Sequence, residues 1–149
     1  MRILRNPRRR RRGSVLVETA FVMTLMTTFV FGIFEYSRLL MDWNLLNNAA
    51  REGCRYALAN NTDSAVATTV QSIVTNYMAG ETKSFSNFTV TLSGTHDGVS
   101  TAVGDLAAGD MIQVTISGTY TFMNIVPMVK MPTSLTISTS VVMVCEGGT

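Results

Sequence analysis

The chain has 149 residues, a net charge of +2 and only 15% charged residues, which leaves room for one modest folded domain and an anchor. Seven of the twelve basic residues precede Ser14, and the rest of the chain has five basic residues against ten acidic ones. A basic tail can bind nucleic acid, but its position directly before an apolar run favours a membrane-topology signal and no nucleic-acid partner.

The first predicted element is a membrane-spanning helix. Between Val15 and Phe34 only Glu18 is ionisable, and about 20 such residues span a bilayer core. Basic residues concentrate on the cytoplasmic side of these helices. The small-residue cleavage site of a secretory signal is missing after the run, which predicts a retained anchor. The expected organisation is a cytoplasmic leader over 1–13, a transmembrane helix over 14–36 and an exported domain over 37–149.

The helix is expected to continue beyond the membrane, because no proline interrupts residues 14–60. Apolar residues recur there at spacings of three and four, which forms one stripe on a helix and predicts packing against the exported domain. They are Leu39, Trp43, Leu46, Ala50, Gly53 and Ala57. Polar residues are expected largely off the stripe, namely Arg38, Asp42, Asn47, Asn48, Arg51, Glu52 and Arg55.

A second amphipathic helix is predicted from about Asp63 to Met78, with Asp63 or Thr62 as its cap and Gly80 at its end. Its inward residues are expected to be Val66, Val70, Ile73, Val74 and Tyr77. Beyond it, period-two alternation predicts strands at Phe88–Ser93, Met111–Phe122 and Leu135–Val144, with turns at His96–Gly98 and Ala107–Asp110. Pro127 and Pro132 bracket the last connection. The expected fold is α+β, a long helix and a short helix with a small antiparallel sheet.

Motifs for chemistry are few. His96 is the only histidine, and its turn-like surroundings predict a solvated side chain. The sequence contains no metal-ligand spacing, nucleophile motif or phosphate loop, so neither an enzyme nor a cofactor is expected. Cys54 and Cys145 are the only cysteines. Export to an oxidising compartment would permit a disulfide between them, and two unpaired buried thiols are the alternative that the sequence leaves open.

Gly13 and Glu18 have a recognisable spacing. A glycine ends the basic leader, and Glu18 is the fifth residue after it, inside an apolar helix. This pattern resembles the processing site of type IV pilin-like proteins, which implies cleavage between Gly13 and Ser14 by a prepilin peptidase. The freed amine of Ser14 would then pair with Glu18 of a neighbouring subunit. The competing interpretation is that Glu18 lies close enough to the cytoplasmic headgroups to be hydrated.

The stretch "GIFEYSRLLMDWNLLNNAAREGCRYALA" (residues 32–59) resembles TadE-like proteins, minor pseudopilins of bacterial tight-adherence (Tad/Flp) systems. The matching residues are Gly32, Glu35, Arg38, Leu39, Ala49, Ala50, Arg51, Glu52, Gly53, Arg55, Tyr56 and Ala57. Arg51, Glu52 and Arg55 are candidates for polar contacts at the base of the exported domain, with a partner subunit or among themselves.

The resemblance implies a non-enzymatic subunit that initiates or stabilises a pilus used for adherence. Its partners would be the prepilin peptidase and other minor and major pilins. Its place would be the bacterial inner membrane, crossed once, with a cytoplasmic N-terminus and a periplasmic domain that enters the fibre or stays at its base. The alternative function is a signal-anchored extracytoplasmic binding protein that never enters a filament.

Overall fold

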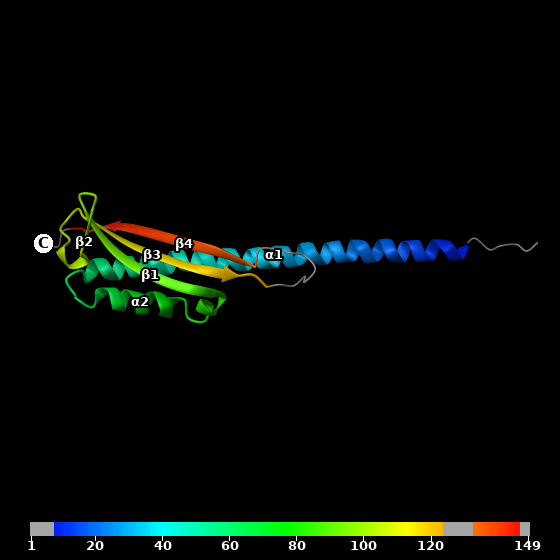
Figure 1. Ribbon diagram of the computed structural model, residues 1–149, viewed down its shortest axis with the longest axis horizontal. Coiled ribbons are helices and arrows are strands. Elements are labelled where there is room, and N and C mark those ends of the chain that lie inside the picture. Colours follow the sequence, from blue (N-terminus) through cyan, green and yellow to red (C-terminus); the bar gives the residue numbers. More distant parts are fainter. Residues whose placement is uncertain (1–7, 124–132, 147–149) are drawn as a thin grey trace, which may run out of the picture. The chain divides into compact units, whose positions relative to one another are not determined.

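The computed structural model describes the backbone of residues 8–123 and 133–146, with side chains from Gly13 onward. The chain divides into two compact units, Met1–Ser37 and Arg38–Thr149. Over the described residues the elements follow the order α1, α2, η1, β1, β2, η2, β3 and β4, and the four strands form one antiparallel sheet (Figure 1). The predicted α+β class is therefore confirmed. The connection bracketed by Pro127 and Pro132 lies outside the described residues.

Helix α1 (Arg8–Ala59) is uninterrupted over 52 residues. The continuous helix expected over 14–60 is confirmed, and it begins earlier, within the arginine run. Among the described helices it alone is long and apolar enough to cross a membrane. Its most apolar stretch of 18 residues has a mean hydropathy of 1.8, and none of that stretch is buried.

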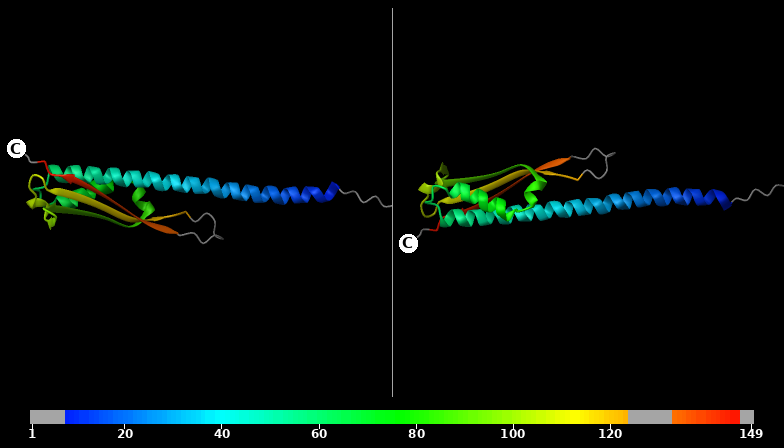
Figure 2. Two further views of the ribbon diagram at one scale, coloured as in Figure 1. Left: turned by 90° about the horizontal axis from the view of Figure 1, so that it is seen from above. Right: turned by 90° about the horizontal axis from the view of Figure 1, so that it is seen from below.

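In the second unit, the C-terminal part of α1 and helix α2 (Val66–Tyr77) lie on the same face of the sheet (Figure 2). They meet at Gly53, where an added Cβ would lie 3.2 Å from side-chain atoms of both Val70 and Val74 and 3.8 Å from Val114. The missing side chain therefore lets two helices and a strand pack closely. The fully buried core residues are Leu46, Ala49, Ala50, Cys54, Ala57, Val70, Val74, Met78, Ile112, Val114, Ile116 and Tyr120.

The expected stripe on α1 is correct except near its start. Trp43 is 47% exposed, whereas Asp42, expected off the stripe, is fully buried. Leu39 and Leu46 lie two turns apart, and a period of 3.6 residues places their shared face between positions 42 and 43. The packing selects Asp42, so hydrophobicity alone assigned the wrong neighbour to the buried face.

Helix α2 begins later and is phased differently from the prediction. Its N-cap residue is Ala65, and Asp63 precedes the helix and accepts a hydrogen bond from the Ala65 N–H through Oδ1 at 2.9 Å. At the other end, Tyr77 was expected inside but is 47% exposed, and Met78 is fully buried. Met78 is four residues after Val74, so it continues the stripe that Val66, Val70 and Val74 begin. Gly80 follows with φ +102°, a conformation that suits glycine.

The sheet has the strand order β2-β1-β3-β4. Its strands are β1 (Phe85–His96), β2 (Val99–Thr101), β3 (Met111–Thr121) and β4 (Ser134–Val144). The last two match the prediction to within one residue at their ends, and β1 is longer than the expected Phe88–Ser93. Side chains of β3 alternate strictly between the core and the opposite face. The core therefore lies between β3 and the two helices.

Strand β2 was not predicted, and a turn explains its presence. Asp97 and Gly98 have φ values of +46° and +80°, and His96 pairs with Val99 across them. Two consecutive residues of positive φ make the mirror-image turn that joins strands most tightly. The expected turn at His96–Gly98 is thus a hairpin that carries the chain back along β1.

Candidate assembly site on the N-terminal helix

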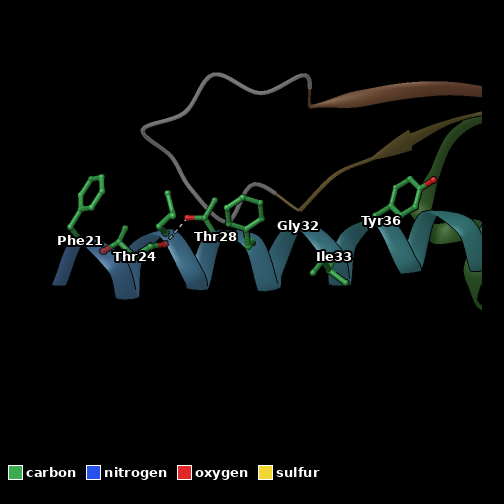
Figure 3. Close-up of a pocket in the computed structure, with 8 residues that line it drawn as sticks. Phe21, Thr24, Thr28, Gly32, Ile33 and Tyr36 are labelled. Carbon is green, nitrogen blue, oxygen red and sulfur yellow. Dashed lines mark hydrogen bonds between the residues drawn. The ribbon is translucent and has the colours of Figure 1, made fainter. Parts of the chain in front are cut away.

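The apolar part of α1 presents its side chains outward. Leu16 and Phe21 are 72% and 71% exposed, and Ile33 is 65% exposed. Figure 3 shows Phe21, Ile33 and Tyr36 projecting from the helix. Such exposure is unfavourable in water and favourable in hydrocarbon or against another apolar helix.

The hydroxyl groups of this segment are satisfied within the helix. Each threonine between Val15 and Phe34 donates to the carbonyl oxygen four residues earlier, at 2.8–2.9 Å. The dashed line in Figure 3 marks one of these bonds, from Thr28 to Thr24. Bonds of this kind lower the cost of placing a hydroxyl in lipid. Glu18 is the only ionisable residue between Val15 and Phe34.

Gly13 and Glu18 lie on the same continuous helix, and Glu18 is exposed. Ser14 precedes Glu18 by four residues, so the two share a face about 6 Å apart along the axis. A Cβ built on Gly13 would have no atom within 4 Å. The described fold therefore gives no packing reason for glycine at position 13.

Arg51, Glu52 and Arg55 lie on the exposed side of α1. Arg55 Nη1 is 3.7 Å from Glu52 Oε2, and these side chains are 74% and 48% exposed. An exposed pair at this spacing contributes well under 1 kcal/mol. Arg51 lies thirteen residues after Arg38, which is about 20 Å further along the helix. Because these side chains are exposed, their charges are available to solvent or to a partner.

Cys54 and Cys145 are both buried free thiols in the structure. Cys54 Sγ donates to the carbonyl oxygen of Val141 on β4 at 3.3 Å, so this thiol already links α1 to the last strand. Burial raises the pKa of Cys54 above its ordinary 9.0, and a bond involving the backbone of Val114 partly opposes that shift. Burial, followed by the charge of Asp110, also raises the pKa of Cys145. Both groups are therefore protonated, weakly nucleophilic thiols near neutral pH.

Sequence reasoning missed two polar contacts of the second unit. Arg38 Nε donates to the buried hydroxyl of Tyr120 at 2.7 Å, and the guanidinium carbon is 5.2 Å from the centre of the ring. His96, expected in solvent, has a 55% exposed side chain but lies 2.6 Å from Asp110. In both cases the partner lies on an element that only the sheet topology brings near.

The family model described as "TadE-like protein" matches residues 13–55. No curated protein and no solved structure matches the chain. The matched segment begins at Gly13, includes Glu18 and ends at the exposed charged residues of α1. The predicted resemblance to TadE-like proteins is therefore confirmed for residues 13–55.

Proposed function

We propose that the chain is a TadE-like minor pseudopilin that assembles through its N-terminal helix and initiates or stabilises a Tad/Flp-type pilus used for adherence. The observation that carries this proposal is the family match, which starts at the expected processing glycine and covers the outward-facing apolar helix. An apolar helix with 0% of its most apolar stretch buried has its packing partner outside its own fold, either lipid or another helix.

The leader sets the orientation in this proposal. Its arginines remain on the cytoplasmic side of the inner membrane, and residues 37–149 are exported to the periplasm. A prepilin peptidase cuts between Gly13 and Ser14. The open space around Gly13 supports this role, because the described fold would accept a side chain there.

Cleavage creates a positive charge at Ser14 that can pair with the carboxylate of Glu18. The new amine of Ser14 is a cation at the membrane surface, and a carboxylate in lipid is tolerated when it meets one. Staggered parallel helices bring the amine of one subunit to Glu18 of the next, so the pair fixes the register of assembly. The threonines of the segment support this role, because their hydroxyls donate to carbonyl oxygens within the helix. Glu18 is then the polar side chain of the segment that would bind a partner outside the helix.

The test replaces Glu18 in an organism that builds the pilus from this subunit. Glu18→Leu and Glu18→Gln are expected to reach the membrane at normal abundance and to abolish fibres or reduce them severalfold. Thr19→Val is the matched control, because the Thr19 hydroxyl donates its hydrogen bond within the helix, to the carbonyl oxygen of Val15. Normal fibres from both Glu18 variants would contradict the proposal and favour a simple anchor.

A further inference from the structure

His96 and Asp110 add a side-chain contact at the end of the β1–β3 pairing, where Thr95 lies opposite Met111. His96 ends β1 at the tight turn to β2, and Asp110 directly precedes β3. The distance from His96 Nδ1 to Asp110 Oδ1 is 2.6 Å. Asp110 is 6% exposed, so a nearly buried carboxylate faces a half-exposed imidazole.

Asp110 also organises the end of the last strand. Its Oδ2 accepts a hydrogen bond from the Ala107 N–H at 2.6 Å, which holds the turn before β3. Its backbone carbonyl accepts from the Cys145 N–H at 2.7 Å, and the Gly109 N–H donates to the Cys145 carbonyl at 2.9 Å. One carboxylate residue therefore connects the β1–β2 hairpin, the turn before β3 and the residue after β4.

The charge around His96 is acidic. Asp97 Oδ2 lies 3.7 Å from His96 Nε2, on the opposite side of the ring from Asp110. Asp97 is 93% exposed at its side chain, so its pull is weakened by solvent. The nearby elements carry two further carboxylates, Asp105 in η2 and Glu146 after β4. They also carry the Cys145 thiol, whose pKa is raised by burial and then by the charge of Asp110.

We propose that protonated His96 is a pH-dependent clasp, which fastens the β1–β2 hairpin to the Asp110 turn in mild acid and loosens as the pH rises. The imidazolium donates from both ring nitrogens, to Asp110 and toward Asp97. Neutral imidazole loses the charge and one of the two donors, so the attachment weakens without the strands separating.

The pH window follows from the two partners. The bond to Asp110, followed by its charge and that of Asp97, raises the pKa of His96 above 6.5. The bond from the Ala107 N–H, followed by the contact with His96, lowers the pKa of Asp110 below 3.8. The contribution of His96 is complete below 6.5 and is lost as the pH rises through its folded pKa, whereas that of Asp110 is lost as the pH falls through its folded pKa. The clasp is therefore tightest from about pH 4 to 6.5.

The first experiment titrates the full-length protein in detergent micelles by proton NMR of the imidazole. His96 is the only histidine, so an affinity tag without histidine leaves one imidazole signal to follow. The wild-type pKa is expected above 6.5. Asp110→Asn should lower it toward 6.5. Asp97→Asn, the control that removes the exposed carboxylate next to His96, should lower it less. A wild-type pKa at or below 6.5, or equal effects of the two variants, would overturn the clasp.

The second experiment measures how the clasp affects the reactivity of Cys145, the residue that follows β4. In a Cys54→Ala background, Cys145 is the only thiol, and it is 6% exposed. At about pH 6, His96→Gln should react with a maleimide severalfold faster than the parent, and the ratio should fall toward one by about pH 9. Comparison at a single pH removes the direct effect of bulk pH on the thiolate fraction. Equal rates at about pH 6, or a ratio independent of pH, would contradict the proposal.

Discussion

Arg38 on α1 and Tyr120 on β3 are joined by a hydrogen bond of 2.7 Å, although 82 residues separate them in the sequence. Arg38 also lies 3.4 Å from the carbonyl oxygen of Thr121 through Nη2. The Tyr120 hydroxyl belongs to a fully buried side chain. Because Arg38 is the first residue of the second unit, this bond attaches the start of that unit to β3.

Tyr120→Phe should destabilise the second unit by about 1.5–3 kcal/mol, the usual range for a hydrogen bond to a charged group. The change keeps the ring, which packs edge-on against Phe85 and Phe122, and removes only the hydroxyl. Urea unfolding of the full-length protein in detergent, followed by circular dichroism, measures the loss. Tyr77→Phe, at an exposed ring, is the control, and equal stability of the two variants would show that the Arg38 bond contributes nothing.

Neighbouring residues at the end of α2 distinguish the observed phase of the helix from the one predicted from sequence. Met78→Ala should cost about 2–5 kcal/mol because it opens a cavity in the core, whereas Tyr77→Ala should cost less than about 1 kcal/mol. Met78 is 0% exposed and Tyr77 is 47% exposed. The same urea titration compares them. A larger loss for Tyr77→Ala would mean that the helix is rotated from the position described.

Gly94→Ala should destabilise the sheet by about 1–3 kcal/mol through overpacking. A Cβ at Gly94 would lie 2.8 Å from the backbone oxygen of Thr101 and 2.9 Å from Leu106 Cδ1, and the backbone atom has little freedom to move. Gly104→Ala is the matched control, since its nearest neighbour would be 3.8 Å away. That variant should stay within about 0.5 kcal/mol of wild type. Similar midpoints in urea for the two variants would contradict the close packing of β2 and η2 on β1.

The thiol of Cys54 should make the fold sensitive to alkali. Its pKa is raised by burial, so its favourable contribution is present below the ordinary value of 9.0 and is lost as the pH rises through the folded value. Cys54→Ala should therefore be less stable than wild type at pH 8, with a gap that narrows above pH 9. Unfolding free energies from about pH 8 to 10.5 measure this gap. A gap that stays constant would mean that the thiol does not ionise on unfolding in this range.

The sequence predicted the elements better than their contacts. Periodicity without proline identified α1, and alternation identified β3 and β4 to within one residue, because these are local properties of the chain. Strand β2 has only three residues, too few for a pattern, and it exists because the Asp97-Gly98 turn returns the chain to β1.

The polar contacts were not predictable for a different reason. His96 and Asp110 were each assigned to a turn, but their 2.6 Å contact requires the antiparallel pairing of β1 with β3, which places Thr95 opposite Met111. Asp42 was assigned to the polar face because it is charged, and packing buried it. By contrast, the signal at Gly13 and Glu18 is a spacing in the sequence, and the family match covers both positions.

In the proposed assembly, the leader is removed so that a new terminus can meet Glu18. The most direct measurement is the intact mass and N-terminal sequence of the full-length protein, extracted from membranes after co-expression with a prepilin peptidase. We expect a chain thirteen residues shorter that begins at Ser14. Gly13→Leu, which the described fold can accommodate, should keep its leader. A wild-type chain that still begins at Met1 under these conditions would contradict the claim.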